Sequence, residues 1–219
     1  MTLLDQPGAI TEPGTEEWLR SRLGKLTASR FKDIVGRKKN GDYYEKRQSY
    51  MIELIAERLT GMMADKFMYG PMQWGIETEP AALTAYAAKT GEEVTRTGFV
   101  DHPRIPMSGC TPDGLVGYDG LVEVKCPESR THIEYLINRV APEDYLPQMN
   151  WQMACTGRAF VDFVSFDPRM PEGLRLFVVR VERDEKQIAA YEQDAMDFLK
   201  EMAWMIQRVE SGHVTSDEL

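Results

Sequence analysis

Three side chains with the capacity for chemistry lie close together in the sequence: Asp113, Glu123 and Lys125. Side chains alternate between the two faces of a strand, so Glu123 and Lys125 share one face if residues 121–126 form a strand. Burying such charges is unfavourable unless another group compensates them. A divalent cation bound by hard carboxylate oxygens would compensate them, and it would also support in-line hydrolysis of a phosphodiester.

Asp113 can reach the same site only through a turn. It lies in Pro-Asp-Gly, a common turn sequence, so a structural turn aspartate beside an ordinary Glu-Lys pair is the alternative interpretation. A hairpin through residues 118–120 would bring Asp113 back to the edge where Glu123 lies. The three residues at this spacing favour a metal site over an isolated turn.

The charge is distributed unevenly along the chain. The net charge is −9, which disfavours a polyanionic partner for the protein as a whole. Ten basic and three acidic residues nevertheless lie between positions 20 and 47, a net charge of +7, whereas residues 182–219 carry −6. A basic region on an acidic body suits local phosphate binding, although a solvated helical face would give the same charge run.

Length and composition restrict the class of protein. The chain of 219 residues can form one substantial domain, and no run approaches the roughly 18 apolar residues of a membrane span. The first 14 residues show no export signal. The three cysteines are odd in number and widely spaced, which favours reduced thiols in a cytoplasm over disulfides or zinc.

Hydrophobic periodicity predicts the order of elements. We expect helices over residues 16–23, 28–35, 43–59, 74–90, 129–138, 144–155 and 186–210, and strands over 94–100, 107–110, 121–126, 160–166 and 174–181. This order predicts an α/β fold with a mixed β-sheet flanked by helices on both faces. We interpret residues 1–219 as a single domain: an extended arm (1–14), a helical part (16–91), a sheet core (92–181) and a C-terminal helix (185–210).

A second set of polar residues precedes the predicted helix at 28–35. Thr27 and Ser29 offer hydroxyls, Arg22 offers a guanidinium, and a helix N-terminus offers backbone N–H groups. Together these groups could bind a phosphate. A helix N-cap beside a surface arginine is the simpler interpretation of this segment taken alone.

Taken in chain order, these motifs resemble the phage lambda exonuclease, or YqaJ-type viral recombinase, family of the PD-(D/E)xK nuclease superfamily. The matching segments are Trp18 to Ser29, Trp74 to Glu79, Thr111 to Leu115, Glu123 to Pro127, Asp167 to Met170 and Glu182 to Lys186. The resemblance implies a restriction-endonuclease-like core. It also implies a Mg²⁺-dependent exonuclease that digests the 5′-terminated strand of double-stranded DNA and leaves a 3′ overhang for recombination.

The resemblance implies roles for the acidic residues and the lysine. Asp113, Glu123 and the backbone carbonyl of Val124 would bind one or two Mg²⁺ ions, with Mn²⁺ as a substitute. Lys125 would orient or deprotonate the attacking water, and Glu79 would be a further carboxylate beside the metal. These are the ligands expected for hard cations.

The resemblance also implies residues that act on the DNA. Gln148 matches the glutamine of the helix after the catalytic strand, although Gln152 is close enough to be the alternative. The DNA-binding residues implied are Arg22, Thr27 and Ser29 for a 5′-phosphate, Lys39 on a nearby loop, and Met72 against the terminal base pair.

The implied partners are double-stranded DNA ends, two further copies of the chain in a ring-shaped homotrimer, and a single-strand annealing protein. The implied setting is the cytoplasm of a bacterial host, with a phage or prophage origin. Two alternatives stay open. One is an endonuclease with the same metal site, and the other is a non-catalytic DNA-end-binding module in which Asp113, Glu123 and Lys125 are structural.

Overall fold

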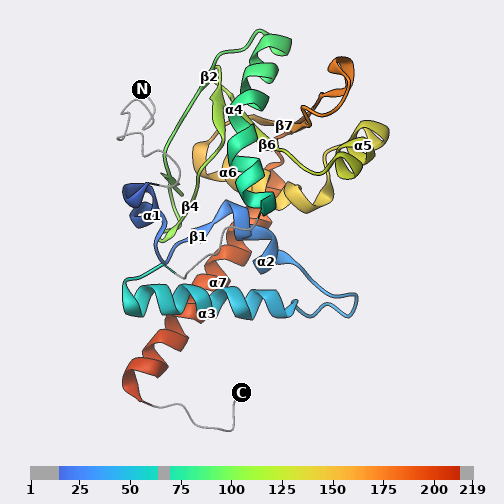
Figure 1. Ribbon diagram of the computed structural model, residues 1–219. Coiled ribbons are helices and arrows are strands. Elements are labelled where there is room, and N and C mark those ends of the chain that lie inside the picture. The colour runs from blue at the N-terminus through green and yellow to red at the C-terminus, as the bar shows by residue number, and fades with distance from the viewer. Residues whose placement is uncertain (1–14, 64–69, 213–219) are drawn as a thin grey trace.

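The computed structural model describes residues 15–63 and 70–212 of the chain (Figure 1). The helices are α1 (Glu16–Arg22), α2 (Phe31–Val35), α3 (Glu45–Thr60), α4 (Gly70–Thr90), α5 (Ser129–Asn138), α6 (Leu146–Thr156) and α7 (Glu185–Ser211). Short 3₁₀ turns lie at Ala28–Arg30, Glu143–Tyr145 and Glu172–Leu174. Among the helices of these residues, none combines the length and the apolar character needed to cross a membrane.

The main sheet has five strands in the order β2-β5-β6-β7-β8. Their bounds are Val94–Thr95 (β2), Gly114–Val116 (β5), Gly120–Lys125 (β6), Phe160–Phe166 (β7) and Leu176–Glu182 (β8). β6 and β7 pair in parallel and the other neighbours pair antiparallel, so the sheet is mixed, as predicted. A smaller sheet of order β1-β4-β3 joins Leu26–Thr27 (β1), Ser108–Cys110 (β4) and Val100–Asp101 (β3).

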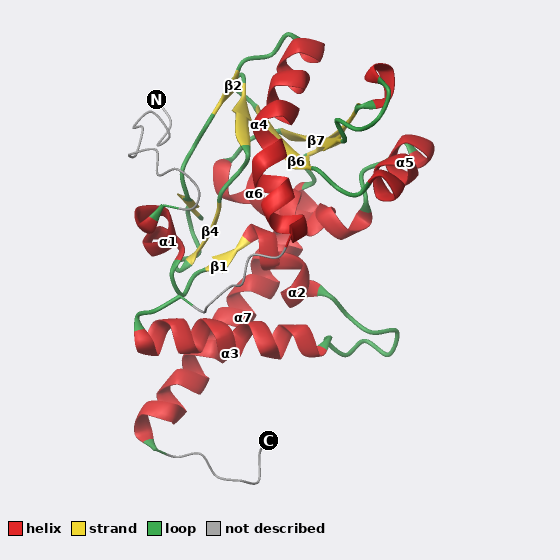
Figure 2. Ribbon diagram, viewed as in Figure 1, coloured by secondary structure: helices red, strands yellow, loops and turns green. Residues whose placement is uncertain are grey.

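Both faces of the main sheet are covered. Leu121 of β6 belongs to the large core that contains buried residues of α2, α3, α6 and α7. Val122 and Val124 belong to a second core, in which they pack with Ala82 and Tyr86 of α4. Figure 2 shows α4 crossing the viewer's side of the strands. The predicted alternation of side chains along residues 121–126 and the helices on both faces are therefore confirmed.

The strand predicted over residues 94–100 is wrong as a single element. Its first residues form β2, whereas Val100 pairs with Cys110 in the small sheet. An added Cβ at Gly109 would lie 2.4 Å from the carbonyl oxygen of Val100, so only glycine permits this close pairing. A non-local contact thus divides the segment between two sheets.

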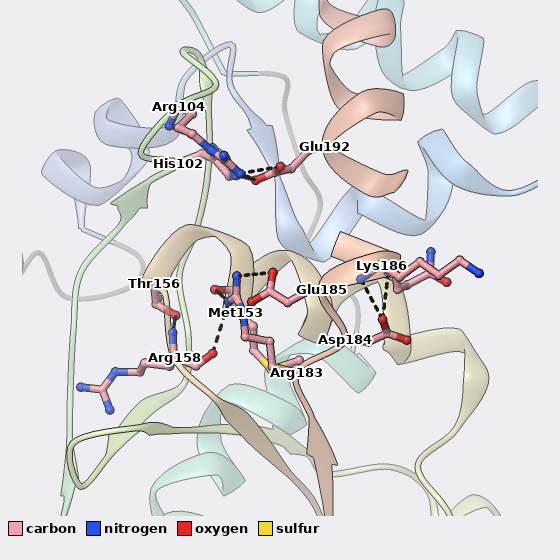
Figure 3. Close-up of polar contacts among 11 residues, drawn as sticks. His102, Arg104, Met153, Thr156, Arg158, Arg183, Asp184, Glu185, Lys186 and Glu192 are labelled. Atoms are coloured by element: carbon pink, nitrogen blue, oxygen red, sulfur yellow. Dashed lines mark hydrogen bonds and ion pairs between the residues drawn. The ribbon is translucent and has the colours of Figure 1, made fainter. Parts of the chain in front are cut away.

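The start of α7 is tied to α6 through one arginine. Asp184 Oδ1 caps the helix by accepting the backbone N–H groups of Lys186 at 2.9 Å and Gln187 at 3.0 Å (Figure 3). The neighbouring Arg183 donates to the carbonyl of Met153, near the end of α6. Because α6 carries Gln148 and Gln152, this junction helps to fix the helix that lies over β6.

The loop between β3 and β4 is held on α7 by a second polar contact. Arg104 Nη2 lies 2.6 and 2.7 Å from the carboxylate oxygens of Glu192, and His102 Nε2 lies 3.2 Å from Glu192 Oε1 (Figure 3). The His102 ring also stacks on Trp151 of α6, with 4.8 Å between the ring centroids. The small sheet is thereby fixed against α6 and α7.

A buried polar group anchors α4 to the main sheet. Tyr86 donates its hydroxyl to Asp162 Oδ2 of β7 at 2.6 Å, and Arg180 of β8 forms two hydrogen bonds to the same carboxylate at 2.8 and 2.9 Å. Tyr86 is fully buried and Asp162 is 3% exposed. Since Glu79 lies two helical turns before Tyr86, this anchor also fixes the height of Glu79 above the sheet.

We expect Tyr86→Phe to lower the free energy of unfolding by about 1.5–3 kcal/mol, because a buried hydrogen bond to a charged group is lost without a change of shape. Urea or thermal unfolding followed by circular dichroism measures this. The matched control is Tyr118→Phe, at a tyrosine that is 82% exposed, which should change stability by less than about 0.5 kcal/mol. Equal losses in the two variants would contradict the anchoring role of Tyr86.

Candidate functional site

A cavity of about 450 Å³ lies at the end of β6. It brings together Glu79 from α4, Asp113 from the turn before β5, Glu123 and Lys125 from β6, and Gln148 from α6. Val124 also lines it. The structure therefore gathers in one place the acidic, lysine and glutamine residues that the sequence predicts as a site.

The predicted hairpin explains the position of Asp113. β5 and β6 pair antiparallel, with Gly114 opposite Val122 and Val116 opposite Gly120. The turn therefore lies at residues 117–119, close to the predicted one. The backbone N–H of Val124 donates to Asp113 Oδ2 at 2.7 Å, which fixes this carboxylate beside the end of β6.

Glu123 is 1% exposed, and its carboxylate accepts hydrogen bonds from three side chains. Lys125 Nζ and Gln148 Nε2 donate to Oε1, the latter at 2.6 Å, and Gln152 Nε2 donates to Oε2 at 2.6 Å. Gln148 and Gln152 share one helical face because they are four residues apart. Only Gln148 of the two lines the cavity; Gln152 is fully buried behind Glu123.

The buried charges shift one another's pKa. Burial raises the pKa of Asp113 well above its ordinary value, and the negative charge of Glu123 acts in the same direction. Burial alone would lower the pKa of Lys125, but the charges of Glu123 and Asp113 outweigh it and raise that pKa. Several ionisable side chains with shifted pKa values in one cavity are typical of a functional site.

Glu79 reaches the cavity from α4, which covers the face of the main sheet opposite α6. Arg96, just after β2, places Nη1 at 2.8 Å from Glu79 Oε1. Burial raises the pKa of Glu79, the positive charge of Arg96 lowers it, and the charge of Glu123 raises it. Glu79 thus lies within electrostatic range of Glu123.

The acidic side chains of the cavity already have hydrogen-bond or ion-pair partners within the chain. In residues 15–63 and 70–212, no three His, Cys, Asp or Glu side chains converge into a ready-made metal site. The oxygens of Glu123 accept from Lys125 and two glutamines, and Glu79 is paired with Arg96. Three carboxylates line the cavity, and carboxylate oxygens are ligands that Mg²⁺ and Mn²⁺ take, whereas zinc favours sulfur and nitrogen.

The predicted phosphate-binding residues line the same cavity. Arg22 lies with its guanidinium 4.2 Å from the centre of the Trp18 ring, and burial lowers its pKa. Thr27 Oγ1 is 3.4 Å from Ser29 Oγ and 3.4 Å from the hydroxyl of Tyr50. Arg22, Thr27 and Ser29 therefore share one cavity with the carboxylates, although they lie about 90 residues earlier in the chain.

Two details of the predicted phosphate site are wrong. The helix expected from residue 28 begins as a 3₁₀ turn, and α2 starts only at Phe31. Thr27 makes no side-chain cap, since it lies in β1, where Leu26 and Thr27 pair with Ser108 and Gly109. Strand pairing with the small sheet outweighs the local helical pattern and leaves the hydroxyl of Thr27 directed toward Ser29 and Tyr50.

The structure does not bring Lys39 to the cavity, and it leaves the prediction for Met72 untested. Lys39 lies on an exposed turn after α2 and is not among the residues that line the cavity. Met72 belongs to α4, but its side chain lies outside the described residues.

Other cavity residues have no assigned role in the sequence analysis. Trp18 donates its indole N–H to Thr111 Oγ1 at 3.1 Å, and the Tyr145 ring lies 4.8 Å from Lys125 Nζ. Arg96, which pairs with Glu79, belongs to the same group. The conspicuous Trp18 and the Thr-Pro-Asp-Gly turn could have signalled the contact between Trp18 and Thr111, whereas no pattern in the sequence points to Arg96 or Tyr145.

A buried carboxylate, Asp167, fixes the segment after β6 through Arg169. Asp167 is fully buried and pairs with Arg169, whose Nη2 donates to the carbonyl of Pro127 at 3.2 Å. Burial opposes ionisation of Asp167, but hydrogen bonds from Arg169 and from Ser129 at the start of α5 outweigh it and lower the pKa to about 2. The segment that follows Lys125 is thereby fixed.

Comparison with known proteins matches the chain to a protein family. A sequence model of the YqaJ-like viral recombinase domain matches residues 17–159, which include every predicted site residue. No curated protein sequence matches the chain.

Solved structures agree with the family match. An alkaline exonuclease (LHK-Exo) from Laribacter hongkongensis is 44% identical, with a TM-score of 0.85 over 90% of this chain and 97% of that one. The same values hold for its complex with dAMP. A phage-related exonuclease from Haemophilus somnus, 18% identical with a TM-score of 0.69 over 84% of this chain and 96% of that one, shares the fold.

We expect ionised Asp167 to stabilise the fold only above acidic pH. Its pKa is lowered from 3.8 to about 2, so the contribution of up to about 2 kcal/mol is present above pH about 4 and is lost as the pH falls toward 2. The free energy of unfolding of wild type and Asp167→Asn, measured by urea titration between pH 2 and 6, tests this. The difference between the two proteins should shrink as the pH falls; a constant difference would contradict the lowered pKa.

Proposed function

The chain belongs to the YqaJ-like viral recombinase domain family, and we propose that it is a Mg²⁺-dependent exonuclease acting on the ends of double-stranded DNA. It would hydrolyse the 5′-terminated strand and leave a 3′ overhang for single-strand annealing. One observation carries the proposal: a single cavity contains both the Asp113, Glu123 and Lys125 set and the Arg22, Thr27 and Ser29 set. The likeness to an alkaline exonuclease over 90% of the chain supports nuclease chemistry.

The first set suits hydrolysis of a phosphodiester. Asp113, Glu123 and the carbonyl of Val124 would hold one or two Mg²⁺ ions, with Glu79 as a further carboxylate. When bound, the ion would stabilise the negative charge that develops on the phosphoryl oxygens during hydrolysis. Lys125, hydrogen-bonded to Glu123, would orient the attacking water as an ammonium, and it would deprotonate that water only if the bound ion lowered its raised pKa.

Glu123 needs a fixed orientation for this role, and α6 supplies it. Gln152 holds one carboxylate oxygen from the buried side, while Gln148 holds the other from the cavity side. We therefore assign Gln148 as the active-site glutamine and Gln152 as a positioning residue. Two fixed donors restrict the rotation of the carboxylate, which is the kind of preorganisation that catalysis requires.

The second set suggests which end of the strand enters. A terminal 5′-phosphate carries more negative charge than an internal phosphodiester, and it would bind the Arg22 guanidinium and the Thr27 and Ser29 hydroxyls. Binding the terminal phosphate in the same cavity as the carboxylates would place a neighbouring phosphodiester of the same strand near Lys125. This arrangement supports digestion from the 5′ end.

The proposal also includes how the protein assembles and where it acts. The family resemblance supports a ring-shaped homotrimer around DNA, a single-strand annealing partner and a cytoplasmic site of action in a bacterial host. The basic residues at the cavity on an otherwise acidic chain are compatible with DNA held at the centre of such a ring.

We expect Asp113→Asn to lower nucleotide release from linear duplex DNA by on the order of 10³-fold, because several kcal/mol of charge stabilisation are lost and each 1.36 kcal/mol is tenfold. Asparagine retains an oxygen that can accept the Val124 N–H, so the fold should be preserved. The matched control is Asp119→Asn, on the exposed turn of the same hairpin, which should retain wild-type activity. If Asp113→Asn kept its Mg²⁺-dependent activity, the catalytic assignment would be wrong and a non-catalytic module would be favoured.

We expect radiolabel at a 5′ end to be released before label at a 3′ end, and faster when the 5′ end carries a phosphate. Arg22→Gln should remove the preference for the phosphate, because the guanidinium that distinguishes the two ends is lost. Arg20→Gln is the matched control, since Arg20 is exposed on the same helix and pairs with Glu16. Initial rates on four duplexes, labelled at either end with and without the phosphate, measure both effects.

Two outcomes of the same assay would contradict the proposal. Release from the 3′ label first would reverse the polarity. Cleavage of a covalently closed circular duplex, which has no ends, would favour the endonuclease alternative.

A further inference from the structure

Arg96 occupies the wall of the cavity but has no place in the proposed chemistry so far. It follows β2, the edge strand of the main sheet, and it lines the cavity together with Thr97 and Phe99. Its side chain is 42% exposed, and Nη1 lies 2.8 Å from Glu79 Oε1. A cation is thus held in a cavity that three carboxylates also line.

A purely structural role explains Arg96 poorly. β2 is already fixed by backbone pairing, with Val94 opposite Val116 and Thr95 opposite Leu115. Ion pairs with one half-exposed partner add little to folding stability, because water screens them. The fold therefore has little need of the guanidinium, whereas the cavity has a clear need for positive charge if a phosphate backbone is to enter beside three carboxylates.

Glu79 sets the direction of the guanidinium. The carboxylate binds through Nη1, and a guanidinium has five N–H donors in a planar fork that matches phosphate oxygens. Glu79 comes from α4, which Tyr86 anchors to the sheet, so the pair is attached to a rigid element. Arg96 is thus oriented by a fixed partner and remains accessible to a ligand in the cavity.

We propose that Arg96 binds an internal phosphate of the DNA strand that enters the cavity, separately from the terminal phosphate assigned to Arg22. The inference rests on the proposed function, since it requires DNA in this cavity. The two arginines come from different elements, Arg22 from α1 and Arg96 from the loop after β2, so each can contact its own phosphate. Arg96 is a substrate-positioning residue, and Glu79 holds it in place in addition to serving as a carboxylate beside the ion.

The test is equilibrium binding of a linear duplex to wild type, Arg96→Gln, Arg96→Lys and the control Arg20→Gln. The buffer contains Ca²⁺, a hard cation that takes the same oxygen ligands, and the salt concentration is varied from about 50 to 200 mM. Arg96→Gln should raise the Kd on the order of 10-fold and reduce the slope of log Kd against log salt by about 0.9, the value for one phosphate contact. Arg96→Lys should keep the slope, because the charge is retained.

Duplexes with and without a 5′-phosphate separate the two arginines. Arg96→Gln should weaken binding of both ends by the same factor, whereas Arg22→Gln should abolish the difference between them. Thermal unfolding of Arg96→Gln should match that of Arg20→Gln, which excludes a folding defect as the cause.

If Arg96→Gln matched Arg20→Gln in both Kd and slope, the inference would be overturned and the proposed function would stand. If wild type bound no duplex ends at all, the proposed function would fail and the inference with it. A loss confined to 5′-phosphorylated ends would place Arg96 in the terminal-phosphate site and would also overturn the inference.

Discussion

The buried carboxylate of Glu123 is the constraint on which the site depends. A carboxylate that is 1% exposed is tolerated only if its oxygens accept hydrogen bonds and its charge is balanced. Lys125 supplies the charge, and Gln148 and Gln152 supply the donors. Satisfying Glu123 therefore ties the middle strand of the main sheet to α6 and fixes the orientation of the carboxylate that faces the cavity.

The same principle recurs in the elements that surround the site. Asp162 joins α4 to β7 and β8 through Tyr86 and Arg180, and Asp167 joins the end of β6 to the start of α5 through Arg169. Each buried carboxylate accepts a hydrogen bond from at least one group on another element, so a shift of α4 or α6 would remove a donor from Asp162 or Glu123. Rigid positioning of this kind is what a hydrolytic site needs, because small displacements of its ligands are costly.

The sequence predicted the site well where the signal was local. The period of two along β6 and the Pro-Asp-Gly turn were sufficient to place Asp113 beside Glu123, because strand alternation and turn chemistry are short-range. The i, i+4 spacing placed Gln148 and Gln152 on one face, but only the packing of α6 against β6 shows that one faces the cavity and the other does not. The division of residues 94–100 and the pairing of β1 with β4 could not be predicted, since both depend on contacts about 10 to 80 residues away.

The basic segment between residues 20 and 47 has a net charge that is a poor predictor of where the protein would bind phosphate. Its +7 charge suggested a phosphate-binding face, yet many of its cations are paired within the protein: Arg20 with Glu16, Lys25 with Asp101, Arg30 with Asp33 and Glu53, Lys32 with Asp144, Arg37 with Asp194, and Arg47 with Glu201. Arg22 differs, since it lies on the Trp18 ring and lines the cavity. Arg96, from outside the segment, brings positive charge to the same cavity. Positive charge at the site thus depends on which individual arginines reach the cavity, and the sum along the sequence is a poor guide to it.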